Sequence, residues 1–402
     1  MSIRIRNKNP RRRAVSFALV GVSLVMLLGM ASLTVDVGML YRARAEAQAS
    51  ADAAAMAGAW RLLDNDKLKG TANMTAEIAD ARTVAAAMAA LNVIVNQSPS
   101  LDANTSNDTN GDIMVGYLSD PDHSTGESLS TANASQFNTV RVHVRRDASH
   151  ASPIDLYFAG VFGRLTADIS AEAYATFKDG VVGWKVTENT GNAGLLPLAL
   201  KTTKPPGQPL DAWNNLLNGT FTSGDNYTYN PTTGAVTAGP DGINELNLYP
   251  GGGATQLPPG NFGTVDIGDP GNSTADLARQ IRYGVSADDL AYYGGELKLG
   301  ADGTLSLTGD TGLSAALKDD LTSIIGQPRV IPLFSAVAGP GNNSIFTIVG
   351  FAGIRILDVQ LTGSMSSKKV IIQPAFIVDD AVLTGPGSGS SYFVYQPVHL
   401  VR

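Results

Sequence analysis

The side chains that could do chemistry in this chain are few, and they fall in no catalytic pattern. There is no cysteine, which excludes thiolate nucleophiles, thiolate metal ligands and disulfide bonds. The histidines match no metal-binding spacing; they are His123, His143, His150 and His399. His143 alternates with Val142 and Val144, which predicts an exposed strand position rather than a ligand. The sequence therefore predicts no metal site, no cofactor and no enzymatic activity.

Two polar stretches partly match known functional motifs, one catalytic and one calcium-binding. Ser366 and Lys369 have the S-x-x-K spacing of lysine-activated serines, but their flanks are strand-like and no companion motif occurs. Ser106–Asp112 alternates oxygen-bearing side chains before Gly111, as in the first half of a calcium loop. The twelfth position of that loop would be Tyr117 instead of glutamate, so we prefer an Asx and glycine turn, with calcium binding as the alternative.

The clearest element is an apolar segment near the N-terminus. Residues 14–35 read AVSFALVGVSLVMLLGMASLTV and contain no charge. As a helix they span about 33 Å, enough to cross a hydrocarbon core of about 30 Å. The basic residues before it are Arg4, Arg6, Lys8, Arg11, Arg12 and Arg13, and the first charge after it is Asp36. The positive-inside rule predicts a single transmembrane helix at 14–35, with residues 1–13 cytoplasmic and the body periplasmic or extracellular.

A cleaved signal peptide is the alternative interpretation of this segment. Phe17–Leu28 would be its apolar region, and Gly29-Met30-Ala31 would be a small-x-small cleavage site. Apolar residues continue past that site through Leu33 and Val35, which favours an uncleaved anchor in a bacterial inner membrane. Both interpretations export the body of the chain.

The exported body is acidic. Six of the 29 Lys and Arg residues precede the apolar segment, which leaves 23 basic against 36 acidic residues, a net charge of −13. Nucleic acid is therefore not an expected partner, because phosphate binding needs a basic surface.

Beyond the apolar segment, the sequence predicts an alanine-rich stalk that continues the helix. Residues 41–63 carry two small-residue stripes at i, i+4 spacing: Ala43, Ala47, Ala51, Ala55 and Ala59, and Ala45, Ala49, Ala53 and Ala57. Such stripes allow another helix to approach closely, whereas the alternative is a solvated stalk. The packing partner would be a second helix at 74–96, with Asn73 as its N-cap, in a helical hairpin, or the stalk of another copy.

The remaining sequence predicts an α+β fold with a mostly β C-terminal region. Strand patterns occupy 113–118, 139–145 and 167–177, and a short apolar helix or turn occupies 154–163. Further along, we predict helices at 274–282 and 313–325, a hairpin at 297–307, and apolar strands at 330–334, 344–359 and 369–378. The predicted domains are residues 36–178, a helical stalk with an α+β unit, and residues 180–402, a β-rich exported domain.

The residues around the apolar segment carry a recognisable pattern. RRRAVSFALV is followed by LTVDVGMLYRARAEAQASADAAAMAGA, which runs from basic residues through an apolar helix to D-x-G and an A-D-A-A-A-x-A-G-A stretch. This pattern resembles the N-terminal signature of the Flp pilus-assembly TadE/TadG-like family. The matching positions, which we take as candidate site and packing residues, include Asp36, Gly38, Arg42, Gln48, Ala51, Asp52, Ala55 and Gly58. We call these the signature residues.

The resemblance implies a non-enzymatic, inner-membrane-anchored component of tight-adherence (Tad) pilus assembly or secretion. Its partners would be other Tad components, or a second copy through the Ala-rich helix. Pseudopilin-type relatives usually carry Gly before a prepilin-peptidase cut and Glu five residues after it. Here Arg13-Ala14 and Ala18 stand at those positions, so we predict no processing.

Two further functions stay open beside pilus assembly. Some longer relatives carry a von Willebrand-type domain with a D-x-S-x-S metal motif, which this sequence lacks. The main alternative is an adhesin-like surface or periplasmic binding module on the same anchor, because loops rich in Gly, Asn and Thr are compatible with binding. A periplasmic hydrolase with an unrecognised site is the third reading, and converging carboxylates in a deep pocket would favour it.

Overall fold

The computed structural model describes residues 10–63, 65–69, 74–119, 128–202, 211–220, 222–249, 257, 260–269, 271, 273–339, 341–385 and 391–401. They form two compact units: residues 1–58, 82–114 and 140–174, and residues 59–81, 115–139 and 175–402. Helices and strands are mixed throughout, which confirms the predicted α+β class. The division into domains at residue 180 stays a prediction.

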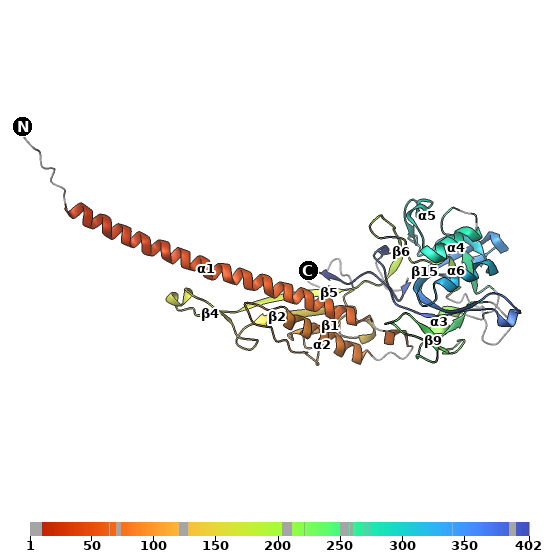
Figure 1. Cartoon of the computed structure of the whole chain (residues 1–402), viewed down its shortest axis with the longest axis horizontal. Coiled ribbons are helices and arrows are strands. Elements are labelled where there is room, and N and C mark those ends of the chain that lie inside the picture. The colour runs from red at the N-terminus through yellow and green to blue at the C-terminus, as the bar shows by residue number, and fades with distance from the viewer. Residues whose placement is uncertain are drawn as a thin grey trace, which may run out of the picture. The chain divides into compact units, whose positions relative to one another are not determined.

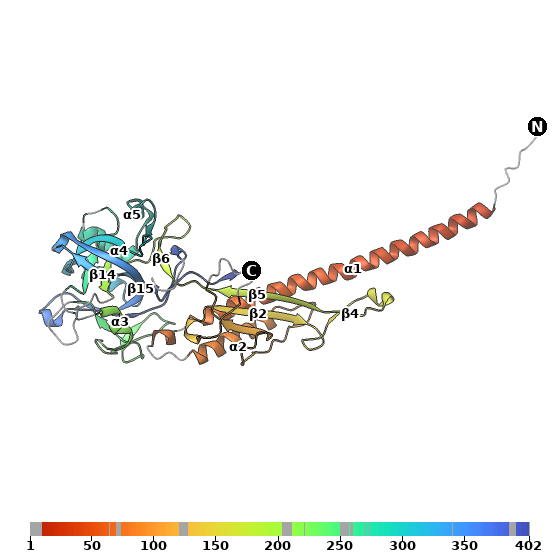
Figure 2. The same ribbon diagram turned by 180° about the vertical axis from the view of Figure 1, so that it is seen from behind.

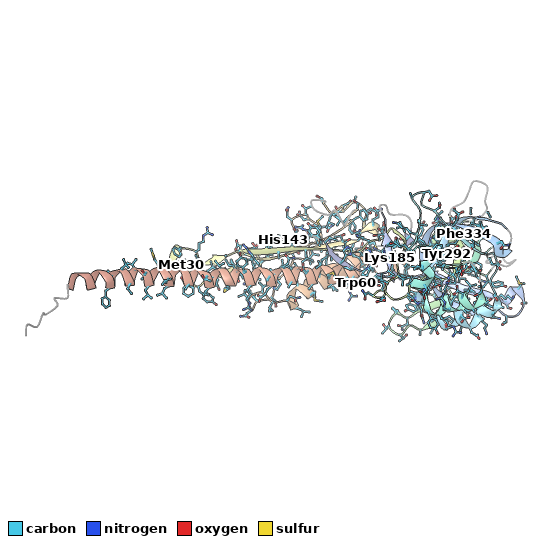
Figure 3. The ribbon with its side chains drawn as sticks, turned by 90° about the horizontal axis from the view of Figure 1, so that it is seen from above. Met30, Trp60, His143, Lys185, Tyr292 and Phe334 are labelled. Carbon is cyan, nitrogen blue, oxygen red and sulfur yellow. The ribbon has the colours of Figure 1, made fainter. Side chains whose placement is uncertain are left out.

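Helix α1 (Pro10–Arg61) runs unbroken from the apolar segment into the alanine-rich stretch, over about 78 Å. Among the described residues, it is the one helix long and apolar enough to cross a membrane. Almost every side chain from Phe17 to Val35 is exposed, and Figure 3 shows Met30 projecting from this bare part of the helix. An apolar helix surface without protein cover suits a lipid environment. The predicted apolar helix and its extension as a stalk are confirmed.

Helix α2 (Thr75–Leu91) runs antiparallel to α1, after the 3-10 turn η1 (Asn65–Leu68). Ser50 contacts Ala89, and Arg61 contacts Asp80 further along, so the two helices form the predicted hairpin. The predicted end at residue 96 was wrong: Val95 and Asn96 have φ angles of 47° and 62°, which an α-helix excludes. The predicted N-cap, Asn73, lies outside the described residues.

Strands β1 (Ile113–Gly116), β2 (Thr139–Arg146) and β5 (Ile169–Thr176) are neighbours in one sheet, where strands were predicted. Alternation on β2 buries Val140, Val142 and Val144 and leaves the intervening side chains half-buried. Figures 1 and 2 show these strands beside the C-terminal part of α1.

A short hairpin connects β2 to β5. Strand β3 (Ile154–Asp155) pairs with β4 (Thr166–Ala167), and the 3-10 turn η4 (Ala159–Phe162) lies between them. The short apolar helix or turn expected at 154–163 is therefore this single 3-10 turn at the end of a two-stranded hairpin.

A ring of strands forms the centre of the second unit. The neighbours β15, β13, β11, β7 and β14 close on themselves, because β14 also pairs with β15. Their bounds are Ser344–Gln360, Leu305–Asp310, Phe262–Val265, Leu198–Lys201 and Pro328–Ala338. Phe334 and Phe346 meet edge to face inside one buried cluster, with ring centroids 5.0 Å apart. Gly263 is required there, since a β-carbon would lie 2.5 Å from the Phe346 ring.

A second buried cluster joins the strands to short helices. Trp213 of α3 (Ala212–Leu217), Ile281 of α4 (Thr274–Tyr283) and Leu321 of α6 (Lys318–Ser323) pack in it with side chains of β14 and β15. Among the described residues, this unit also contains helix α5 (Ala287–Ala291) and the 3-10 turns η3 (Ala134–Gln136), η5 (Ala315–Leu317), η6 (Gly341–Asn343) and η7 (Met365–Ser367).

The other strands extend or flank this ring. Strands β16 (Lys369–Pro374) and β10 (Leu246–Asn247) continue the sheet beyond β15, and β19 (Ser391–Tyr392) pairs with β15. Smaller sheets join β12 (Leu297–Lys298), β6 (Val181–Trp184) and β18 (Val382–Thr384); β17 (Ile377–Val378) and β20 (Val394–Tyr395); and β8 (Tyr227–Tyr229) and β9 (Val236–Ala238). The last strand is β21 (His399–Val401).

Two predictions for this unit need correction. The chain does turn near Gly303, but β12 pairs with β6 while β13 pairs with β11 and β15, so the predicted hairpin at 297–307 was wrong. The helix predicted at 313–325 is only η5 followed by α6. The helix predicted at 274–282 and the three apolar strand regions are present as α4 and as β14 to β17. The mostly β C-terminal region is confirmed.

Candidate functional site

The buried carboxylate of Asp36 marks the end of the apolar part of α1. Asp36 is 2% exposed, whereas its neighbours Val35 and Val37 are 52% and 42% exposed. Tyr157 donates its backbone N–H to Asp36 Oδ1 at 2.8 Å. Phe158 and Ala159 donate theirs to Oδ2 at 2.9 Å and 2.7 Å. One side chain of α1 thus holds the β3–β4 connection, and we call this contact the Asp36 latch.

The latch keeps Asp36 charged. Burial alone raises the pKa of this carboxyl, but the hydrogen bonds from Phe158, Tyr157 and Ala159 together outweigh it, so the net pKa lies below its ordinary value. Asp36 is therefore ionised at neutral pH, and its charge is matched by three N–H dipoles in place of a cationic side chain. The sequence predicted Asp36 as a site residue but gave no indication of this partner.

Gln48 and Asp52 form the second polar contact among the signature residues. Gln48 Nε2 donates to Asp52 Oδ1 at 2.8 Å, one turn along α1, and to the backbone carbonyl of Glu172 on β5 at 3.1 Å. The Glu172 carboxylate also forms an ion pair with Arg141 on β2. The pair therefore joins α1 to the sheet.

The first alanine stripe is covered by the chain itself. Ala47, Ala51 and Ala55 are at most 1% exposed. Ser50, on the same face, donates its hydroxyl to the carbonyl of Ala89 on α2 at 3.2 Å. Because a hydroxyl reaches the facing backbone directly, the two helices are closely apposed here. The second stripe differs, since its members Ala45 and Ala49 are exposed.

The sequence missed Glu46, which supports the residues after α2. Its Oε2 accepts the N–H of Val95 at 2.8 Å, and its Oε1 pairs with Arg42 at 2.7 Å. The hydrogen bond from Val95 is the main cause that lowers the pKa of Glu46. Val95 is β-branched and has a positive φ, which is unfavourable and needs such support. The i, i+4 spacing of Arg42 and Glu46 was a signal for their pairing.

The two signature glycines behave differently. Gly58 is buried within α1. Gly38 is exposed, and a β-carbon there would meet no atom within 4 Å, so nothing in the structure explains a glycine at this position.

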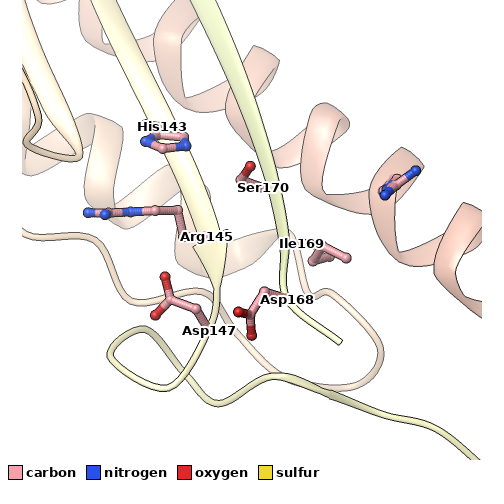
Figure 4. A pocket seen from close by; sticks show the side chains of 7 residues that line it. His143, Arg145, Asp147, Asp168, Ile169 and Ser170 are labelled. Atoms are coloured by element: carbon pink, nitrogen blue, oxygen red, sulfur yellow. The ribbon is translucent and has the colours of Figure 1, made fainter. Parts of the chain in front are cut away.

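A polar pocket of about 380 Å³ lies between α1 and the sheet; its lining residues are Arg44, His143, Arg145, Asp147, Asp168, Ile169 and Ser170. Figure 4 shows the side chains that line it, with Asp147 and Asp168 at its lower end. His143 was predicted to be exposed, but it is half-buried, and burial followed by the nearby charge of Arg145 lowers its pKa. The hydrogen bond from His150 lowers the pKa of Asp147, which therefore stays ionised and is a poor proton donor.

The polar stretch read as a turn or half a calcium loop is held by its own hydrogen bonds. Asn104 Oδ1 accepts the N–H of Asp108 at 2.9 Å, and Asp108 Oδ1 accepts the N–H of Asn110 at 2.8 Å. The Asp112 carboxylate accepts from Arg145 and from the N–H of Asp102. The Asp108–Asn110 contact spans two residues, as in an Asx turn. In the described parts of the chain, no three His, Asp or Glu side chains cluster as metal ligands do.

Lys369 is not placed as a base for Ser366. Its ammonium group pairs with Asp358 and lies 3.3 Å from the Tyr227 hydroxyl. The contact with Asp358 raises the pKa of Lys369, whereas a lysine that activates serine needs a lowered pKa. Of the histidines, His123 lies outside the described residues, and His399 contacts the carbonyl of Pro397.

Two protein-family models match the part of the chain that contains these contacts. Residues 14–61 match the model of a Flp pilus-assembly TadE/G-like family, and residues 57–175 match that of a Tad-like Flp pilus-assembly family. No curated protein and no solved structure matches the chain. The matched residues contain the Asp36 latch, the Gln48–Asp52 contact and the helical hairpin.

Proposed function

We propose that this chain, whose residues 14–175 belong to the Tad-like Flp pilus-assembly family, is a non-enzymatic, membrane-anchored component of the pilus-assembly apparatus. The observation that carries the proposal is the Asp36 latch. It ties the end of the apolar helix to the β3–β4 hairpin of the same compact unit, and both partners lie within the matched residues. The Asp36 side chain holds the exported unit against its membrane anchor. Such a contact is expected in a structural component and has no catalytic role.

The proposed location is the bacterial inner membrane, crossed once by residues 14–35. The supporting features are the exposed apolar face of α1 and the cluster of basic residues before it, which keeps that end in the cytoplasm. The rest of the chain then lies in the periplasm or outside the cell. Its net charge is negative, so nucleic acid is not an expected partner.

The proposed partners are other Tad components. Self-association through the alanine-rich helix would have to use the face that carries Ala45 and Ala49, because the chain itself covers Ala47, Ala51 and Ala55. A second copy is therefore a candidate only for the exposed stripe.

Deleting the gene from the native bacterium and counting pili by electron microscopy tests the proposal. We expect pili to be lost, and to return with the full-length chain but not with a version whose residues 14–35 are replaced by a cleavable signal peptide. Normal piliation in the deletion strain would contradict an assembly role. Normal pilus numbers with reduced attachment to surfaces would instead favour an adhesin-like module.

A further inference from the structure

The tip of the β3–β4 hairpin exposes a dense group of apolar side chains. We define the hairpin tip as residues 157–165, which read YFAGVFGRL. Its exposed apolar side chains are Tyr157 at 71%, Phe158 at 43%, Val161 at 86%, Phe162 at 75% and Leu165 at 71%. Large apolar side chains gathered at one exposed turn mark a surface that contacts another apolar phase or a partner.

Most backbone N–H groups of the tip are hydrogen-bonded within the chain, which lowers the cost of leaving water. Leu156 donates its N–H to Leu165, Val161 to Phe158, Gly163 to Gly160 and Arg164 to Ala159. The N–H groups of Tyr157, Phe158 and Ala159 donate to Asp36. Outside water an unpaired N–H costs several kcal/mol, so irregular backbone enters lipid only when its polar groups are satisfied. A turn in water has no such requirement.

The latch fixes the level of the tip relative to the apolar helix. Asp36 directly follows the uncharged segment 14–35, so the backbone at Tyr157–Ala159 lies at the end of that segment. Figures 1 and 2 both show the loop beyond β4 reaching along α1 toward its N-terminus. Residues 160–163 therefore lie beside the apolar part of α1, and not beside the alanine-rich stalk.

We propose that the hairpin tip is a second membrane contact, in which Phe158, Val161 and Phe162 enter the outer interface of the bilayer that α1 crosses. Exposed Arg164 then lies at the level of the lipid phosphates, where a guanidinium finds an anionic partner. We take the lipid bilayer as the partner of the tip, because α1 crosses the bilayer and the tip lies beside the apolar part of α1. The inference rests on the anchoring part of the proposed function. A second contact restricts the tilt of α1, because interfacial anchors help to set the tilt of a transmembrane helix.

The absence of native cysteine allows a direct test. Full-length Phe162→Cys, Leu24→Cys and Leu91→Cys variants are labelled with an environment-sensitive nitrobenzoxadiazole dye and reconstituted in vesicles of phosphatidylethanolamine and phosphatidylglycerol. Quenching is then measured in two sets of vesicles, one with a nitroxide near the lipid headgroup and one with a nitroxide deep in the acyl chain. Leu91 is a matched control, because it is 77% exposed and close to Ala89, which contacts Ser50, about 21 Å along α1 from Asp36.

The expected result is a blue-shifted emission at positions 24 and 162, with strong quenching by the deep nitroxide at 24 and by the headgroup nitroxide at 162, and neither effect at position 91. Quenching at 24 alone overturns the membrane contact of the tip while leaving the anchor intact. Absence of quenching at 24 as well overturns the anchor itself, and with it the inference. If the label at 162 is unquenched in vesicles, and the unlabelled Phe162→Cys thiol is shielded from a soluble maleimide in cells, a protein partner occupies the tip instead, which also overturns the proposal.

Discussion

Gln48 and Asp52 hydrogen-bond to each other at 2.8 Å along one face of α1, and the same Gln48 amide reaches the carbonyl of Glu172 on β5 at 3.1 Å. These two signature residues therefore form a single structural contact. A side-chain amide is suited to it, because its NH₂ group has two protons to donate. The pairing explains why a charged residue occurs within an otherwise small and apolar alanine stretch.

A double-mutant cycle of Gln48→Ala and Asp52→Ala should reveal this contact. We expect each single change to lower the free energy of unfolding by about 1 kcal/mol, and the coupling energy to be about 0.5–1 kcal/mol. Denaturant unfolding of the detergent-solubilised chain measures it. The control cycle is Arg61→Ala with Asp80→Ala, whose side chains are 55% and 52% exposed and 3.5 Å apart. Coupling at Gln48–Asp52 no larger than in this exposed pair would count against a structural contact.

Larger side chains should destabilise the chain on the covered alanine stripe but not on the exposed one. Ala51 is fully buried, so Ala51→Leu should destabilise the chain by roughly 1–3 kcal/mol, because the helices must separate or adopt strained rotamers. Ala45→Leu, on the exposed stripe of the same helix, should be nearly neutral, since Ala and Leu have similar helix propensities. Melting temperatures of the two variants decide the matter. Equal melting temperatures would show that the stripe is not a packing surface.

The lowered pKa of Lys67 should make the free energy of unfolding depend on pH. Its ammonium lies 3.3 Å from the carbonyl of Phe137 and over the Phe177 ring, and burial lowers its pKa to about 8. Between pH 8 and the ordinary lysine value of 10.5, the unfolded chain binds a proton that the folded chain lacks, so this group makes stability rise with pH. Lys67→Met should therefore stabilise the chain at pH 7 by up to roughly 3 kcal/mol.

The advantage of Lys67→Met should shrink as the pH approaches 10, because wild-type Lys67 is then largely neutral when folded. Unfolding curves of the two chains at pH 7 and at pH 10 provide the measurement. A difference between the chains that does not change with pH would mean that Lys67 titrates normally.

The Asp36 latch predicts protection of three particular amides. Hydrogen exchange at Tyr157, Phe158 and Ala159 should be slow in the wild type and fast in Asp36→Ala, while Leu156, which bonds to Leu165, keeps its protection. The pKa of Asp36 is lowered, so its stabilising charge is present above the ordinary aspartate range and is lost only as the pH falls below that range. Protection corrected for intrinsic exchange should thus be equal at pH 7 and pH 5. A loss of protection already at pH 5 would be inconsistent with the lowered pKa.

The sequence predicted the elements whose signal is local. An uncharged run behind basic residues specifies α1, and alternation specifies β2 and β5. Helix ends were harder to predict. Helix α2 ends at Leu91, and the chain just beyond it is held at Val95 by Glu46, which is distant in the sequence. The strand partners of β12 and β13 were wrong for the same reason: a turn at Gly303 says where the chain bends and not which strands it joins.

The candidate site was predictable as a set of residues but not as a set of contacts. Asp36 was identified through the family pattern, but its partners are backbone N–H groups, which carry no side-chain signal in a sequence. The sequence predicted a short apolar helix or turn at 154–163, but only the structure shows that the hairpin tip lies beside α1 with its apolar side chains exposed. His143 likewise lines a pocket together with Arg44 of α1, a neighbour distant in the sequence that a two-residue alternation cannot indicate.

The most direct test of the account is whether the Asp36 latch is needed for pilus assembly. A strain that lacks the native copy is complemented with Asp36→Ala or with Val37→Ala, which changes an exposed neighbour on the same helix. Membrane abundance of both variants is matched by immunoblot before pili are counted. We predict wild-type piliation with Val37→Ala and a severe loss of pili with Asp36→Ala. Full piliation with Asp36→Ala, at equal abundance, would contradict the account.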